Sequence, residues 1–280
     1  EGGYYALNLN LDPRQFFGLA EQVNTTSMFD RRNITAPYAG FAASGNMLLA
    51  GFRAANGADL KMGLVSMNED DDYGVSSKSL LLEGSVEAVD KLRLGLQLSG
   101  LEEQGSLFGG SSRGALSVDN SDTLAIGLTA RWKLNSKLSM HSIYSQGYSW
   151  VRERQHGILQ NFSTIGSSSY AIGLSGNNTV REGDTLSLTW SSPLHVDDGS
   201  LVLDVPTGYD VVEGRAYREQ EMLELGSSER EMNLELGYHL PLGKQSAMAA
   251  YMLYRDIQAE ITERLARGRY GVMMSVSSRF

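Results

Sequence analysis

The sequence predicts an all-β fold: a transmembrane, antiparallel, up-and-down β-barrel of about twelve strands with an N-terminal helix in its lumen. Three observations predict it. Apolar and polar residues alternate with period two in many segments, long and short connections alternate between these segments, and aromatic residues lie near segment ends on the apolar side.

The alternation is strictest in Lys91–Ser99, where Leu92, Leu94, Leu96 and Leu98 occupy every second position. Such a pattern predicts a strand with one apolar and one polar face. The twelve predicted strands are Phe29–Ala42, Asn46–Ala55, Asp59–Asn68, Lys78–Ala88, Lys91–Ser99, Thr123–Leu134, Lys137–Val151, Gly166–Asn177, Gly183–Leu194, Glu231–Leu240, Ser246–Ile257 and Arg269–Phe280.

The connections fall into two lengths. Short, turn-like ones are Ala55–Ala58, Val89-Asp90, Asn135-Ser136, Asn178–Glu182 and Leu242–Gln245, and longer polar ones are Glu69–Ser77, Glu103–Asn120, Arg152–Ile165, His195–Ser228 and Gln258–Gly268. Bacterial outer-membrane barrels have tight periplasmic turns and larger outside loops. The alternation therefore predicts a periplasmic C-terminus, and its one exception is the first connection, near Ser44-Gly45.

One region leaves the strand count open. Ser200–Val212 and Arg215–Gly226 form a predicted hairpin, which would raise the count to fourteen. Glu219 and Glu221 share a face with Leu223, which is a poor surface for lipid. We therefore interpret this segment as a hairpin that projects from a large outer loop.

In the region before the predicted barrel, we expect a helix to start at Asp12-Pro13, because a carboxylate cap followed by proline is a typical helix start. Pro13–Met28 is either a surface helix or a plug inside the pore. We divide the chain into a linker and pore helix at 1–28 and a barrel at 29–280. The pore helix would present its polar residues, Arg14, Gln15, Glu21, Gln22 and Asn24, to inward-facing Arg93, Arg131, Lys133, Glu231 and Glu235.

Lipid on the outside is favoured over water for three reasons. Twelve strands enclose a lumen too wide for a dry core, since about eight already fill with side chains. The polar faces are rich in Gly, Ser and Thr, as expected of a wet or plugged lumen. Aromatic residues form two predicted girdles: Trp132, Tyr238 and Phe280 at the periplasmic rim, and Tyr148, Trp150, Tyr170 and Trp190 at the outer rim.

Composition narrows the function classes. The net charge of −9, without clusters of Lys or Arg, argues against nucleic acid as a partner. No cysteine is present, which excludes disulfides and thiolate sites. No segment reaches the roughly 18 apolar residues of a transmembrane helix. The first residues do not resemble a signal peptide, so we expect the numbering to start inside a processed or trimmed chain.

The last strand alternates Tyr270, Val272, Met274, Val276, Ser278 and Phe280. This pattern resembles the C-terminal signal by which barrel-assembly machinery recognises its clients.

The chain also resembles the C-terminal translocator barrel of autotransporters (type V secretion), of the kind carrying subtilisin-like passengers. The resemblance rests on Gly100–Gly109 with Arg113–Leu116, on Ser191–Pro206 and on Glu229–Gly243. It implies a twelve-stranded barrel, a helix through the lumen, and secretion of an N-terminal passenger with the assembly machinery and periplasmic chaperones as partners. Self-cleavage at an Asn-Asn pair is not expected, because the helix has Asn24-Thr25.

Catalytic chemistry finds little support in the sequence. The four histidines, His141, His156, His195 and His239, are scattered, so neither a zinc site nor any other metal or cofactor site is predicted. His156 with Asp70, Asp71 and Asp72 is the one conceivable rim cluster of an outer-membrane enzyme. The non-catalytic interpretation is a solvated acidic loop that weakly holds Ca²⁺ or bridges lipopolysaccharide through divalent ions.

The sequence therefore favours a non-enzymatic translocator and anchor in the bacterial outer membrane, in contact with its lipid and lipopolysaccharide. The alternatives are a monomeric porin for small solutes and an outer-membrane enzyme. An occluded lumen favours the translocator, and an open lumen favours the porin.

Overall fold

The computed structural model describes residues 2–8, 17, 37–42, 46–68, 75–111, 114–155, 157–227, 229–243, 246–256 and 269–278. Most of them belong to one antiparallel, twelve-stranded sheet of order β1-β2-β3-β4-β5-β8-β9-β11-β12-β15-β16-β17. Its strands are β1 (Gly2–Asn8), β2 (Asn46–Arg53), β3 (Asp59–Asn68), β4 (Ser76–Val89), β5 (Leu92–Gln104), β8 (Val118–Lys133), β9 (Leu138–Glu153), β11 (Ile165–Asn177), β12 (Thr185–Asp198), β15 (Met232–Pro241), β16 (Ser246–Asp256) and β17 (Tyr270–Ser278).

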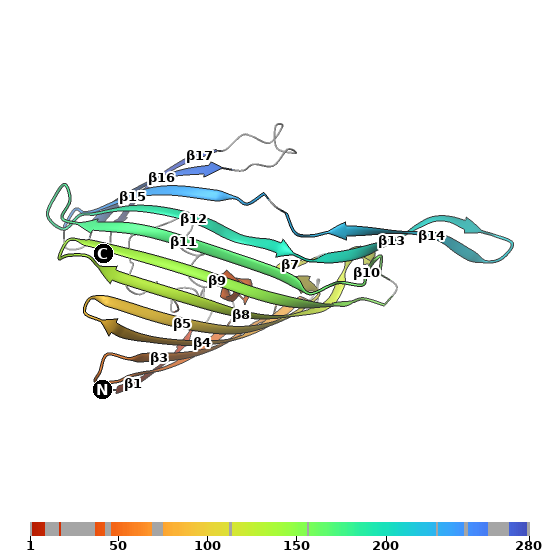
Figure 1. Ribbon diagram of the computed structural model, residues 1–280, viewed down its shortest axis with the longest axis horizontal. Helices are drawn as coiled ribbons and strands as arrows, with labels where there is room; N and C mark the ends of the chain where they lie inside the picture. Colours follow the sequence, from red (N-terminus) through yellow and green to blue (C-terminus); the bar gives the residue numbers. More distant parts are fainter. Residues whose placement is uncertain are drawn as a thin grey trace.

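Smaller elements extend or fill this sheet. They are the short strands β6 (Ser106–Leu107), β7 (Gly110–Ser111) and β10 (Leu159–Gln160), the hairpin strands β13 (Ser200–Asp210) and β14 (Arg215–Glu224), and the 3₁₀ helices η2 (Pro37–Ala42) and η3 (Gly114–Leu116). Strands β10, β13 and β14 form a separate three-stranded sheet. The hairpin β13–β14 projects far beyond the main sheet (Figure 1). The twelve-strand interpretation with a projecting hairpin is therefore confirmed over the alternative of fourteen.

The first strand differs from the prediction. We expected it at Phe29–Ala42, but residues 37–42 form η2, and the strand that pairs with β2 is β1, with Tyr4 opposite Gly51. Strand β1 thus lies ahead of the expected boundary at residue 28. Pro37 supplies the physical reason, because proline cannot donate to a ladder and is disfavoured inside a strand.

This correction removes the one irregularity in the loop pattern. Residues 9–45 now form a long connection between β1 and β2, at the end of the sheet where Asn46 pairs with Ser66 and Asn68 with Ser76. All long connections therefore lie at one end and all short ones at the other. Both chain termini lie at the end opposite the projecting hairpin (Figure 1).

Closure of the barrel is not found in the described residues. Strands β1 and β17 stand at the two ends of the sheet order, and no ladder joins them. The sheet is curved, with a convex and a concave face (Figure 1). In a closed barrel of the predicted strands, the last strand would pair with Phe29–Ala42, but residues 37–42 form a 3₁₀ helix and β17 has a described ladder with β16 alone. Phe280 lies outside the described residues.

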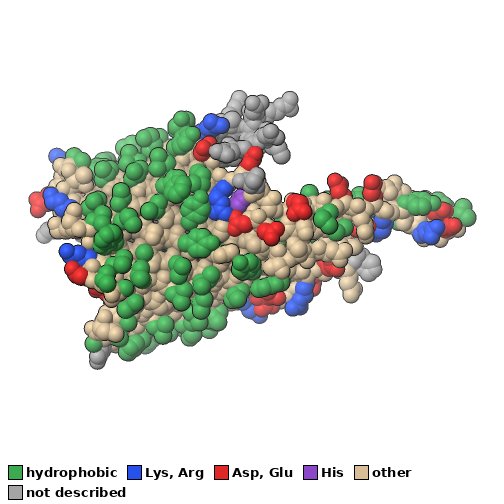
Figure 2. Space-filling view, in the orientation of Figure 1, with side chains coloured by type: hydrophobic (Ala, Val, Ile, Leu, Met, Phe, Trp, Pro, Cys, Tyr) green, Lys and Arg blue, Asp and Glu red, His purple; other side chains and the backbone are tan. Residues whose placement is uncertain are grey.

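The convex face carries the apolar residues of nearly every strand. Leu94, Leu96 and Leu98 on β5 are 41–44% exposed, and Leu124, Ile126 and Leu128 on β8 are 43–58% exposed. Hydrophobic side chains form a broad belt over this face, and charged side chains gather at its edges (Figure 2). The exposed patch far exceeds what soluble monomers show.

Candidate functional site

The concave face is lined largely by small polar residues. Ser145, Ser149, Ser167, Ser169, Ser191, Thr123, Thr129 and Thr189 are all buried there. They alternate along each strand with the apolar residues of the convex face. A wall of serine and threonine suits water or a packed polar insert better than a dry apolar core. The predicted polar lumen face is therefore present on the concave side.

A second part of the concave face is apolar. Met47, Leu49, Val65, Leu81 and Leu101, from β2 to β5, form a buried cluster. Two residues of the β1–β2 connection complete it: Phe17 and Ala39, with exposures of 1% and 0%. We call the described residues of this connection, Phe17 and residues 37–42, the interior loop.

Phe17 packs where β3 lacks a side chain. A Cβ atom added to Gly63 would lie 2.6 Å from Phe17 Cζ and 3.9 Å from Leu81 Cβ. Real Cβ atoms do not approach another carbon that closely, so any larger residue at position 63 displaces the ring. Gly63 thus creates the space in which the interior loop contacts the wall.

Tyr38 makes the equivalent contact further around the sheet. A Cβ atom at Gly147 on β9 would lie 2.5 Å from Tyr38 Cζ. The Tyr38 hydroxyl donates to the backbone oxygen of Ser167 on β11 at 3.0 Å, and it lies 3.0 Å from the Ser167 Oγ. The interior loop therefore contacts the concave wall from β3 to β11, across much of the curved sheet.

Phe41 fixes η2 to the outer end of the wall. Its ring lies 5.7 Å from the Phe108 ring, and its backbone oxygen accepts from Ser77 Oγ at 3.3 Å. The turn that carries Phe108 is held by the Glu103 carboxylate. This carboxylate accepts from the backbone N–H groups of Phe108 and Gly109 at 2.9 and 2.7 Å.

The charged residues predicted to face the lumen occupy two sides of the sheet. Arg93 on β5 is directly opposite Arg131 on β8, whereas Glu235 lies on β15. Arg93 donates to Ser85 Oγ and to the backbone oxygen of Gly57. Glu231 Oε1 lies 3.0 Å from Arg255 Nε in an ion pair. Lys133 is exposed at the end of β8.

Two further ion pairs were not singled out from the sequence. Lys61 on β3 lies 3.6 Å from Glu83 on β4, with both side chains nearly buried, and Gln97 donates to Glu83 at 2.6 Å. Arg53 lies 3.1 Å from Asp59. The alternating pattern places Lys61 and Glu83 on the inward side of their strands, but only the register found in the structure puts them opposite one another.

Several predicted groups fall outside the described residues. These are the pore-helix residues Arg14, Gln15, Glu21, Gln22 and Asn24, and also Asp70, Asp71, Asp72 and His156. Within the part of the chain that is described, no helix is long and apolar enough to cross a membrane, and no cluster of three metal-ligating side chains occurs.

The interior contacts that sequence reasoning missed are Phe17, Tyr38, Phe41, Gly63 and Gly147. One signal was available: Pro37 interrupts a segment that we assigned to a strand. The glycines gave no signal, because Gly63 and Gly147 lie in the alternating pattern like many others.

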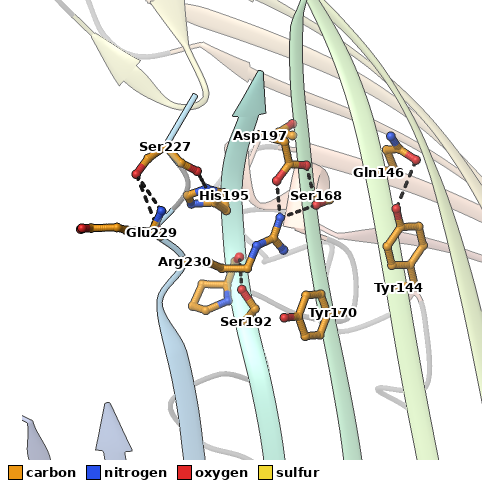
Figure 3. A network of polar contacts seen from close by, with 12 residues as sticks. Tyr144, Gln146, Ser168, Tyr170, Ser192, His195, Asp197, Ser227, Glu229 and Arg230 are labelled. Atoms are coloured by element: carbon orange, nitrogen blue, oxygen red, sulfur yellow. Dashed lines mark hydrogen bonds and ion pairs between the residues drawn. The ribbon is translucent and has the colours of Figure 1, made fainter. Parts of the chain in front are cut away.

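A polar network joins β11, β12 and the segment before β15 (Figure 3). Arg230 binds Asp197 and donates to Ser168 Oγ at 2.7 Å, and its guanidinium carbon lies 5.2 Å from the Tyr170 ring centre. Ser168 donates to Asp197 at 2.6 Å. His195 instead binds the Ser227 backbone oxygen at 2.8 Å, so this network does not join a serine hydroxyl to a histidine.

The predicted aromatic girdles lie on the convex face. Trp132, Tyr148, Trp150 and Trp190 are 43–48% exposed. The outward residues of the last strand, Tyr270, Val272, Met274 and Val276, are 68–73% exposed. An apolar convex belt with aromatic and charged edges, over a concave wall of polar groups, is the inverse of a soluble fold. The surface therefore faces lipid.

No family model and no curated protein sequence matches the chain. The toluene transporter TodX of Pseudomonas putida is 10% identical, with a TM-score of 0.46, over 84% of this chain and 73% of that one. The toluene transporter TbuX of Ralstonia pickettii is 8% identical, with a TM-score of 0.47, over 84% and 72%. The monoaromatic hydrocarbon channel CymD is 12% identical, with a TM-score of 0.30, over 84% and 82%.

The class of the protein follows from the sheet and its hydrophobic belt. An antiparallel sheet with an even number of strands, in which alternate residues face lipid, is typical of bacterial outer-membrane barrels. The chain is an all-β outer-membrane protein of this class.

Proposed function

We propose that the chain forms a passage for small solutes across the outer membrane, and that the interior loop closes this passage. The observation that carries the proposal is the position of Phe17 and Tyr38. Both lie on the concave side, against walls that provide glycine rather than a side chain. This develops the porin alternative raised from the sequence, to which it adds a segment that closes the lumen. Phe17 belongs to the predicted pore segment Pro13–Met28, but this segment follows β1 instead of preceding every strand.

The connectivity supports a loop that closes the lumen rather than a linker. The interior loop lies in the chain between β1 and β2, and both of these strands belong to the main sheet. Asn8, the last residue of β1, is opposite Met47 near the start of β2, so both strands meet this connection at the same end of the sheet. Displacing it breaks contacts of Phe17, Tyr38 and Phe41 but no ladder of the sheet. Conformational changes of this kind occur on a microsecond to millisecond timescale.

The wall beneath the loop would suit solutes of mixed character. Serine and threonine line β9 to β12, while Met47, Leu49 and Val65 line the side of β2 and β3. The compared proteins are two toluene transporters and a monoaromatic hydrocarbon channel. Toluene and a small sugar are therefore suitable test solutes.

The experiment measures single-channel conductance in planar bilayers. Gly147→Ala places a methyl group against the Tyr38 ring, and Tyr38→Ala removes the ring. Both should raise the conductance or the open fraction several-fold. The matched control is Gly100→Ala, because a Cβ atom there meets nothing within 4 Å. The sheet itself should persist in all three variants, as checked by heat-modifiable migration.

Equal, small conductance in the wild type and in both interior variants would contradict the proposal. Uptake of toluene or sugar into proteoliposomes then distinguishes the solute class. A solute that enters through Tyr38→Ala but not through the wild type is a candidate for the passage.

The second candidate is the translocator of an autotransporter, favoured by the twelve-stranded sheet and by an insert on its concave side. Its expected linker must precede the first strand, whereas the described insert follows β1. Surface display would test it: a folded domain fused before Glu1 should reach the cell surface. Retention of that domain in the periplasm would remove this candidate.

A further inference from the structure

A shallow groove crosses the convex face near the outer rim, on the opposite side of the sheet from the interior loop. It has a volume of about 730 Å³ and runs across β1 to β9. Its outward lining includes Leu48, Leu64, Leu80 and Leu124, with Trp150 at one end. These leucines are 42–58% exposed, so the groove is an apolar depression in the surface that meets lipid.

The groove exists because one position in a row of leucines is glycine. Across β3, β4, β5 and β8 the register places Leu64 opposite Leu80, Leu80 opposite Gly100, and Gly100 opposite Leu124. A Cβ atom added to Gly100 would meet nothing within 4 Å. The missing side chain leaves a gap between two leucines, open to the membrane.

The rim of the groove is charged. Lys78, Glu102 and Asp122 lie opposite one another in the next row towards the outer end. Asp122 is 3.7 Å from Arg152, whereas no ion pair joins Lys78 to any described carboxylate. Lys78 is exposed, directly beside the apolar floor. An exposed ammonium beside an apolar groove matches a lipid whose anionic headgroup adjoins its acyl chain.

We infer that this groove binds one acyl chain of lipid A, the anchor of lipopolysaccharide, with a lipid A phosphate beside Lys78. Three features lead to this occupant. The groove continues the lipid-facing belt, its charged rim lies at the end with the long loops and hence in the outer leaflet, and its free cation matches phosphate. The inference is independent of the proposed passage, because it concerns the opposite face of the sheet.

The experiment counts retained lipid by native mass spectrometry. Purified protein in detergent is mixed with defined lipid A, and the number of lipid A molecules per protein is measured. The wild type should retain one molecule. Gly100→Leu fills the gap and should reduce retention at least several-fold. The matched control is Gly84→Leu on the neighbouring strand, an outward glycine beside Leu60 rather than in the groove, and it should leave retention unchanged.

The headgroup is tested separately. Lys78→Gln should reduce binding of bisphosphorylated lipid A several-fold, while binding of the dephosphorylated form should change little. Gly100→Val provides a second, smaller filling residue that suits a strand if the leucine variant folds poorly. Equal retention by the wild type, Gly100→Val and Gly84→Leu would overturn the site. Preferential retention of phosphatidylglycerol over lipid A by the wild type would overturn the occupant.

Discussion

The two faces of the same strands show opposite relations between polarity and exposure. On β5, Leu96 is 44% exposed on the convex face, whereas the adjacent Gln97 is 8% exposed on the concave face. On β4, Leu82 is 37% exposed and Glu83 is 5% exposed. In a soluble protein the leucines would be buried and the charges exposed. The inversion shows that the convex face meets an apolar medium.

The faces also differ in the partners that their side chains need. Convex leucines require only lipid, so each strand is independent of the next in its side-chain contacts. Concave charges require partners on neighbouring strands, as Lys61 has in Glu83. Ion pairs on the concave face therefore help to specify the register of the strands, whereas side chains on the convex face interact with the membrane.

The largest expected effect is all-or-none and tests which end of the strands lies outside. Because the chain has no cysteine, single cysteines can be introduced without background. Val212→Cys at the tip of the projecting hairpin should react with a membrane-impermeant maleimide on intact cells. Val180→Cys, in a short turn at the opposite end, should not react. Both valines are well exposed, at 96% and 73%, so accessibility is matched. The reverse labelling pattern would invert the topology.

A second prediction concerns the concave face. Glu83→Leu removes an ion-pair partner of Lys61 and should cost about 3–5 kcal/mol in the free energy of unfolding, because a nearly buried ammonium loses the carboxylate beside it. The double variant Lys61→Met with Glu83→Leu should recover most of this loss. Urea unfolding in lipid vesicles measures both. No recovery in the double variant would show that the two residues act separately.

An arginine introduced into the hydrophobic belt tests whether the convex face meets lipid. Leu96→Arg or Ile126→Arg should cost about 2–4 kcal/mol, the usual penalty for arginine near the bilayer midplane. Val212→Arg, on the water-exposed hairpin tip, is the control and should change stability by less than about 0.5 kcal/mol. The same vesicle unfolding assay applies. A negligible effect at Leu96 would mean that this face meets water.

The smallest expected effect lies in a short turn outside the belt. Burial acts to raise the pKa of Asp184, but backbone N–H groups of Arg181, Thr179 and Val180, together with the Tyr238 hydroxyl, donate to the carboxylate and lower its pKa overall. A lowered pKa in the folded state means that Asp184 contributes stability above its unfolded pKa. That contribution is lost as the pH falls through the folded value.

The test of Asp184 compares how the free energy of unfolding changes with pH in the wild type and in Asp184→Asn. Between neutral pH and pH 3, the wild type should lose more stability than Asp184→Asn, which has no charge to titrate. Parallel losses in both proteins would show that the turn does not depend on this carboxylate.

The strands of the sheet were more predictable from the sequence than the segment inside it. The strand β3 occupies the predicted residues Asp59–Asn68, and β5, β8 and β9 include most of theirs. Side-chain direction in a strand repeats every two residues, so the pattern defines both position and face. The first strand was misplaced because Gly2–Asn8 shows little alternation and is ordered by pairing with β2.

The candidate site was less predictable than the fold. The sequence suggested an insert in the lumen and inward charges on several strands, but it placed the insert before every strand and ended it at Met28, whereas the insert follows β1 and includes Tyr38. The contacts of Phe17 with Gly63 and of Tyr38 with Gly147 join residues 46 and 109 positions apart. Nothing local in the sequence relates such residues.

The sequence by itself determined an antiparallel membrane sheet, the faces of its strands and the projecting hairpin, because each depends on local periodicity and on loop length. Only the tertiary structure decided which segment forms the first strand, that the chain after it turns inward, and which glycines receive its aromatic rings. It also decided where the convex surface is hollowed, at Gly100. Those features depend on the register between strands and on close packing, in which a side chain fits only where a distant residue leaves room.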